Sequence, residues 1–334
     1  MCSTDRPAAR RAGRSGQPRP AWRKGIAEMA SRTSVLSLVR RAIPAIAGKP
    51  GQANLRLKVT ALAVVNGRHL AGFVSDPSPS LQRIMGERPE LIVGPLVWPY
   101  LCSSWDIPER LDRVVAHYRA LDRLGPPFPF AVTDKLILAE LDAVHPGLRI
   151  VLDQPRWFMR EGGLTLNIFA GDFRAYSLAF SLGESKDGTL YALIGSIQGR
   201  NTENAPELYS DLTKAALGVR PRDLLIEVCR MLCRHWGVQT LLAVRDARRH
   251  HHHPFFAGKT IAPQDYDAIW QDRGGVEHDA EFYRLPIAPD RRRDDEIKPN
   301  KRSMYRRRYQ FLDELERDLI RALPELSPVN FRDT

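Results

Sequence analysis

The hydrophobic pattern of this chain changes character near residue 147, and the change limits the folds that the chain can adopt. Downstream of that point, three segments alternate apolar and polar residues, as strands with one covered face do. Gly171-Asp172 and Lys186-Asp187-Gly188 separate these segments, and both are turn signals of antiparallel hairpins. The pattern therefore predicts a three-stranded meander made of residues 164–169, 176–182 and 189–198.

Helices and strands alternate after the meander. Pro206 opens a predicted helix that Gly218 closes, and Pro221 opens a second helix that ends at Gly237. The pattern then predicts, in order, a strand at 240–244, a helix at 265–271 and a strand at 281–285. This order belongs to the α+β fold class, a mostly antiparallel sheet with packed helices, which we assign to residues 147–290.

The part before residue 147 is predicted to be helical, over residues 33–146. Ser104 and Asp106 cap a helix at 107–123, whose apolar residues recur at helical spacing. A second helix is predicted at 132–144, where four side chains are apolar: Leu136, Ile137, Leu141 and Val144.

The first 32 residues are rich in Arg, Pro, Gly and Ser and contain little that could pack. Such a composition predicts a disordered basic tail, because it cannot repay the entropy of ordering. Whether Met1 or Met29 is the natural start stays open at this point.

The net charge of +11 is distributed unevenly. Residues 1–41 carry ten Arg and Lys against two acidic residues, and 291–309 carry nine against three, so the body between them is mildly acidic. We therefore expect no broad basic groove through the core, and we expect a basic C-terminal helix and tail over 291–334. The sequence contains no DNA recognition motif.

The cysteine count and the lengths of the apolar runs bear on location. Four cysteines are too few for a disulfide framework in a chain of 334 residues. No apolar run approaches the roughly 20 residues that span a bilayer, because Arg40 and Arg41 interrupt the apolar run at 34–47. We expect a cytoplasmic protein, with peripheral contact at the inner membrane as an addition.

Several blocks in the last third place glycines, arginines and tyrosines where a backbone turns tightly or meets an anion. They also resemble the VirK/YbjX family of bacterial proteins, in the same order along the chain. The blocks are Ile194–Gly199, Thr213–Glu227, Tyr266–Gly275 and Lys301–Tyr309, preceded by Trp98-Pro99-Tyr100 and His117-Tyr118. The resemblance implies a role in virulence, envelope maintenance and tolerance of cationic antimicrobial peptides, without a defined reaction.

The strand order is similar to that of the Gcn5-related acyltransferase fold, in which a central strand splays from its neighbour and the following loop holds the pyrophosphate of an acyl carrier. That similarity implies coenzyme A or an acyl carrier thioester as cofactor, and we expect an amine or an envelope precursor as acceptor. We expect ligand contact from Gln198, Gly199, Arg200, Asn201, Thr213 and Lys214. Tyr283 is the expected catalytic residue, as proton donor to the leaving thiolate.

Two interpretations of the 198–204 loop remain open. The loop leaves a strand and enters a helix, where free backbone N–H groups favour an anion that Arg200 is suited to grip. It lacks the acyltransferase pattern, however, and Glu203 would repel the same anion. A plain strand-to-helix turn with a surface arginine fits the sequence as well.

The basic run Arg306, Arg307 and Arg308 also has two interpretations. The solvated face of a packed helix is one of them. The other makes the protein a noncatalytic regulator that binds RNA, a protein partner or an anionic membrane surface through this helix.

No metal site is expected. Four consecutive histidines, 250–253, cannot all point at one ion, and the flanking arginines oppose cation binding.

Overall fold

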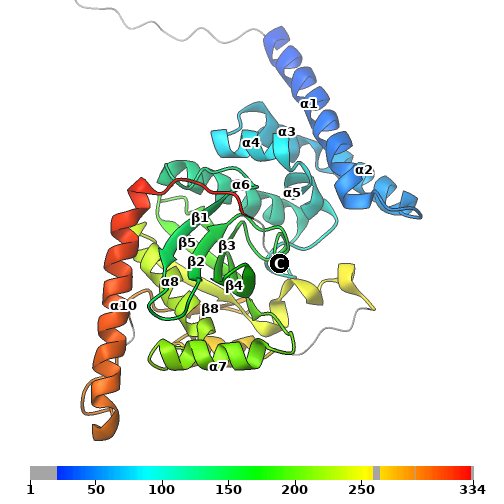
Figure 1. Ribbon diagram of the computed structural model, residues 1–334. Helices are drawn as coiled ribbons and strands as arrows, with labels where there is room; N and C mark the ends of the chain where they lie inside the picture. Colours follow the sequence, from blue (N-terminus) through cyan, green and yellow to red (C-terminus); the bar gives the residue numbers. More distant parts are fainter. Residues whose placement is uncertain (1–20, 259–263, 290, 332–334) are drawn as a thin grey trace, which may run out of the picture.

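An eight-stranded sheet organises the described part of the chain, which in the computed structural model comprises residues 21–258, 264–289 and 291–331 (Figure 1). The strand order is β1-β2-β3-β4-β5-β6-β8-β7. Neighbouring strands are antiparallel except β5 and β6, which are parallel. The strands are β1 (Lys135–Glu140), β2 (Leu148–Asp153), β3 (Leu164–Ala170), β4 (Phe173–Glu184), β5 (Leu190–Gly199), β6 (Thr240–Val244), β7 (Val276–Glu277) and β8 (Phe282–Leu285).

The predicted meander is confirmed as β3, β4 and β5. Its turns contain Gly171 at φ 59° and Gly188 at φ 84°, left-handed conformations that glycine adopts without steric cost. The predicted strand at 240–244 is β6, and the one at 281–285 is β8. The α+β class assigned from the sequence is therefore confirmed.

The predicted helix at 132–144 is wrong, because its centre is strand β1. Leu136 and Leu138 are buried, so the burial alternates as in a strand. The segment pairs with β2, which the sequence did not predict, and the meander therefore has five strands. The sequence of a short apolar run fits either a helix or a strand. Here the pairing with β2 made the segment a strand.

The N-terminal part is helical as far as residue 124. Its helices are α1 (Ala21–Ala47), α2 (Ala53–Val65), α3 (Gly67–Ser75), α4 (Pro79–Glu87), α5 (Glu90–Val93) and α6 (Ile107–Leu124). The predicted cap of α6 is present, because the Asp106 carboxylate accepts a hydrogen bond from Glu109 N at 2.9 Å. Helix α6 packs on β4. Helix α1 begins at Ala21, inside the segment expected to be a disordered tail, and residues 1–20 lie outside the described residues.

Four further α-helices follow in the described residues: α7 (Ala205–Ala215), α8 (Pro221–His235), α9 (Tyr266–Asp272) and α10 (Arg302–Ala322). Three of them match the predicted helices closely, and α10 contains the basic run. Helix α8 packs on β3, β4 and β5. Figure 1 shows α10 standing along one side of the molecule, away from α1 and α2. In the described ranges no helix is long and apolar enough to cross a membrane.

Candidate functional site

A β-bulge interrupts β5 at Gly195. Ala179 of β4 pairs with Ser196 and Phe180 pairs with Ile194, so Gly195 has no partner across the β4–β5 ladder. The parallel pairing between β5 and β6 also ends at this point, with Ile194 opposite Ala243. A bulge bends the strand that carries it. The remainder of β5 therefore continues beyond its pairing with β6.

Helix α9 occupies the place where the two strands part. The buried Tyr266 hydroxyl accepts a hydrogen bond from Ile197 N at 3.0 Å and donates one to Ile197 O at 3.1 Å. Trp270 Nε1 donates to Val244 O at 2.8 Å. Tyr266 thus hydrogen-bonds to the backbone of β5, and Trp270 hydrogen-bonds to the backbone of β6.

Glu161 enters the same region from the loop between β2 and β3. Its backbone oxygen lies where a side chain on Gly195 would begin, which explains why residue 195 carries none. Its buried carboxyl lies 3.3 Å from His250 Nε2 and 3.5 Å from Gln198 Nε2. Burial raises the pKa of Glu161 to about 7, although Ser196 and the nearby Arg249 guanidinium oppose the shift. A carboxyl with this pKa can accept or release a proton near neutral pH.

The segment after β6 supplies basic groups to the site. Burial, assisted by the charges of His251 and Arg249, lowers the pKa of His250 to about 3, so its ring is neutral at physiological pH. The buried Arg249 guanidinium carbon lies 3.9 Å from the centroid of the Tyr266 ring, a cation–π contact. His250 Nδ1, Arg249 Nε and Arg160 Nε are buried and have no hydrogen-bond partner among the described residues. Buried groups of this kind usually have a partner, so each exception calls for an explanation, and a catalytic role is one of them.

A pocket of about 340 Å³ opens beside this buried cluster. Gln198, Gly199, Arg200 and Asn201 all line it, so the structure brings together four of the residues expected to bind a ligand. Gln198 also connects the pocket to Glu161. The rest of the lining is Trp157, Phe158, Arg174, Ala175 and Ser177.

The two arginines that line this pocket differ in whether their charge is already compensated by the protein. Arg174 is buried and pairs with Asp153 at 2.7 Å, so its charge is compensated inside the protein. Arg200 is exposed at the end of β5. Arg200 is therefore the lining cation better placed to meet an anionic ligand.

Thr213 and Lys214 line a neighbouring pocket of about 490 Å³ instead. Tyr176 lies between the two pockets, because it lines the second one while its ring packs against Gly199 of the first. The Thr213 hydroxyl donates to Tyr209 O at 2.6 Å within α7, and Lys214 Nζ lies 3.1 Å from Asp211 Oδ1. The structure therefore divides the six expected ligand-binding residues between two pockets.

Tyr283, the expected catalytic residue, lies on β8 and does not line either pocket. Its side chain is buried, and its hydroxyl accepts a hydrogen bond from Gln271 Nε2 at 2.9 Å. The Arg245 guanidinium carbon lies 5.2 Å from the centroid of its ring. Tyr266, from the third motif block, is the tyrosine at the point where β5 leaves β6.

The three arginines of α10 do not share one surface. Arg306 is exposed and pairs with Asp294 at 3.0 Å. Arg308 turns inward, where its Nε donates to Leu217 O at 2.9 Å. Leu217 follows α7 with φ 56°, so Arg308 binds the backbone at a strained turn. Of the three, Arg306 and Arg307 are exposed.

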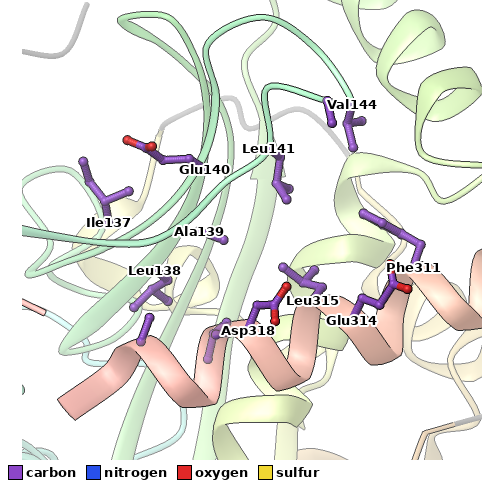
Figure 2. A pocket seen from close by; sticks show the side chains of 13 residues that line it. Ile137, Leu138, Ala139, Glu140, Leu141, Val144, Phe311, Glu314, Leu315 and Asp318 are labelled. Atoms are coloured by element: carbon purple, nitrogen blue, oxygen red, sulfur yellow. The ribbon is translucent and has the colours of Figure 1, made fainter. Parts of the chain in front are cut away.

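A groove of about 600 Å³ runs between β1 and α10, and Figure 2 shows Leu138 and Leu141 on one side and Phe311 and Leu315 on the other. It contains none of the expected site residues. Its ionisable lining residues are acidic: Glu140, Glu314 and Asp318. The groove lacks the acid–base pair found beside β5.

Sequence reasoning missed Glu161, Arg249 and His250 as a cluster. The histidine run drew attention only as a metal tract, and in the described ranges no three His, Cys, Asp or Glu side chains are close enough to hold an ion. Glu161 precedes Gly162-Gly163, a pair that indicates close backbone approach, but nothing local links it to residue 250. Their contact comes from the fold alone.

Comparisons with known proteins bear on the four motif blocks. A family model described as "Protein of unknown function (DUF535)" matches residues 50–321. An uncharacterized protein of Haemophilus influenzae is 32% identical over 48% of this chain, and another is 37% identical over 37%. The alignments cover 52% and 40% of those two proteins, so the chain spans about half of their length or less.

The Escherichia coli uncharacterized protein YbjX is 28% identical over 71% of this chain and 73% of its own length. This similarity and the family match confirm the resemblance to the VirK/YbjX family. No solved structure matches the chain.

Proposed function

The chain belongs to the DUF535 family, and we propose that it transfers an acyl group from a thioester carrier at the point where β5 leaves β6. The observation that carries the proposal is the buried Glu161 carboxyl, whose pKa of about 7 suits proton transfer and which lies 3.5 Å from Gln198 Nε2 in the wall of a pocket. Raised carboxyl pKa values next to a pocket are typical of acid–base centres. The similarity to the Gcn5-related strand order supports the same reaction class, at the level of fold alone.

The carrier's phosphates would lie in the pocket formed by Gln198–Asn201. Arg200 is exposed there and supplies a charge, while Gly199 lets the backbone approach the ligand. The exposed Trp157 indole forms the outer wall and offers a flat apolar surface. Both acyl-coenzyme A and the acylated phosphopantetheine arm of an acyl carrier protein present a phosphate followed by a thioester.

The chemistry would require one bond to form and one to break. The nitrogen of an acceptor amine attacks the thioester carbonyl carbon, a C–N bond forms, and the C–S bond breaks. Glu161 takes the proton that the amine loses, and the neutral His250 ring holds the carboxyl in place. Tyr266 donates a proton to the departing thiolate. Glu161 then passes the proton that it took from the amine to Tyr266, so both side chains return to their starting states.

Tyr266 takes the role that the sequence suggested for Tyr283. Its hydroxyl lies at the bulged end of β5, and burial raises its pKa, against the opposing charge of Arg249. Family resemblance suggests an acceptor among envelope precursors, and with it a part in envelope maintenance, virulence and tolerance of antimicrobial peptides. An intracellular location would fit such a precursor.

The proposal is tested by calorimetric titration of the full chain with coenzyme A and with acetyl-coenzyme A. We expect binding that weakens about tenfold or more in Arg200→Ala, because a charge-assisted hydrogen bond to the phosphate is lost. Arg307→Ala is the matched control, since Arg307 is exposed on α10, outside the pocket. Lack of binding to both ligands at millimolar concentration, or equal binding by Arg200→Ala, would overturn this version.

Release of free thiol in the presence of an amine acceptor separates binding from chemistry. Glu161→Gln keeps the size of the side chain but cannot take up a proton, so it should bind acetyl-coenzyme A and release little thiol. Equal thiol release by this variant and the wild type would remove Glu161 from the mechanism.

A further inference from the structure

Helix α2 is apolar on two faces. Val59 and Ala63 are buried against the other N-terminal helices, as expected for a packed helix. A second set of apolar residues at helical spacing points outward: Leu57, Ala61, Val64 and Val65, which we call the α2 face. Leu57 is 71% exposed, Val64 69% and Val65 79%. No described part of the protein covers these side chains.

The neighbouring helix extends the apolar surface. Leu36 on α1 is 62% exposed, and α1 packs against α2, to which the turn at residues 48–52 joins it. The turn is held in part by Arg56, whose Nε donates to Ala47 O at 2.7 Å. Single exposed leucines are ordinary, but a cluster on one helical hairpin indicates a contact surface.

The charge around this surface has one sign. Residues 29–75 contain no Asp or Glu, whereas the same stretch contains seven Arg and Lys. Of these, Arg40, Arg41, Lys49, Arg56, Lys58 and Arg68 are exposed in the structure. Glu28 and Asp76 bound this stretch, and Asp112 of α6 lies 2.8 Å from His69 Nε2. The α2 face is thus apolar at its centre and cationic around it.

We propose that α1 and α2 dock this face on an anionic phospholipid bilayer. Aliphatic side chains enter the boundary between headgroups and acyl chains, and the surrounding arginines and lysines bind lipid phosphates. A protein partner would more often meet aromatic side chains, and the α2 face has none. Since no described helix can span the bilayer, the hairpin lies on its surface. This inference does not depend on acyl transfer.

Flotation of the full chain with vesicles tests the proposal. We expect co-flotation with vesicles of phosphatidylglycerol and phosphatidylcholine, weak binding to phosphatidylcholine alone, and loss of binding at high salt. The triple variant Leu57→Ser, Val64→Ser, Val65→Ser should bind at least about tenfold more weakly, because the buried aliphatic area is removed. The matched control is Val276→Ser, at an exposed valine on β7. Equal melting temperatures show that the variants fold.

Three outcomes would overturn the proposal. The first is no preference for anionic vesicles. The second is that binding persists in the triple variant but disappears in Arg306→Gln, Arg307→Gln, which would place the contact on α10. The third is a concentration-dependent dimer, detected by light scattering, that the triple variant abolishes; it would show that a second copy of the chain covers the α2 face.

Discussion

The Nε2 atom of His250 lies 3.3 Å from Oε1 of Glu161, and both side chains are almost completely withdrawn from solvent. Their spacing suggests an ion pair, but burial shifts the two pKa values toward the neutral forms, to about 7 for Glu161 and about 3 for His250. Between these values the carboxyl is protonated and the ring neutral. The pair is therefore a neutral hydrogen bond over a wide pH range, and it gains a charge when Glu161 loses its proton near pH 7.

Glu161→Gln should change how stability depends on pH. The folded pKa of Glu161 is raised from 4.5 to about 7, so its contribution to the free energy of unfolding is complete below about pH 4.5. The contribution, at most about 3 kcal/mol, is lost as pH rises through about 7. Urea unfolding at pH 5 and at pH 8 should show a smaller loss in the variant than in the wild type. The same loss in both proteins would contradict the raised pKa.

His250→Gln should have the opposite dependence. The folded pKa of His250 is depressed, so its contribution to stability is present above about pH 6.5 and lost as pH falls toward about 3. The variant lacks this titration and should lose less stability than the wild type between pH 6 and pH 4, measured as the shift in melting temperature. A steeper acid loss in the variant would show that the ring is protonated and paired with Glu161.

Tyr266→Phe should destabilise the protein by about 1–3 kcal/mol, because it leaves a buried N–H and C=O of Ile197 without their hydroxyl partner. Tyr283→Phe is the control and should cost less, since the hydroxyl it removes contacts an exposed Gln271 side chain. Denaturant titration measures both. Thiol release should fall in Tyr266→Phe and persist in Tyr283→Phe; the reverse pattern would restore Tyr283 as the proton donor.

Gly195→Ala should be poorly tolerated. A Cβ atom at residue 195 would lie 1.9 Å from the backbone oxygen of Glu161, which cannot rotate away as a side chain can. We expect a loss of about 1–3 kcal/mol in the free energy of unfolding, together with weaker ligand binding. Gly72→Ala on α3 meets no atom within 4 Å and should be neutral or stabilising. If the two variants unfold alike, the close approach of the loop to the bulge is not present in solution.

Asp153→Asn tests the support beneath the pocket. The Asp153 carboxylate is buried and accepts hydrogen bonds from Arg174 Nη2 at 2.7 Å and from Asn167 Nδ2 at 3.0 Å. Neutralising it removes the buried Arg174–Asp153 charge pair, at an expected cost of about 3–5 kcal/mol. Asp172→Asn, at an exposed turn, should cost less than about 0.5 kcal/mol. The losses of stability are measured by calorimetric melting. Similar losses in the two variants would contradict the importance of the Arg174–Asp153 pair.

The local sequence pattern was sufficient to predict those helices and strands whose own residues show a clear periodicity and clear end signals. The alternating runs with glycine turns became β3, β4 and β5, and the Pro–Gly limits around 206–218 and 221–237 became α7 and α8. The motif blocks identified the family, because they are features of the sequence itself. The α+β class followed from the order of these elements.

Local pattern failed where a partner distant in sequence decides the structure. Residues 135–140 became a strand because β2 pairs with them on one edge and Val329 bridges Lys135 on the other. Arg308 turned inward because the backbone of Leu217 accepts its hydrogen bond, 91 residues away.

The sequence alone determined the family, the strands of the meander and the residues of the loop after β5. Only the tertiary structure decided where the proposed acid–base centre lies, because Glu161, Tyr266 and His250 come from three separate segments that meet at the Gly195 bulge. The physical reason is that a hydrophobic period reports which face of an element is buried, whereas a pKa depends on desolvation and on charges that neighbouring elements bring.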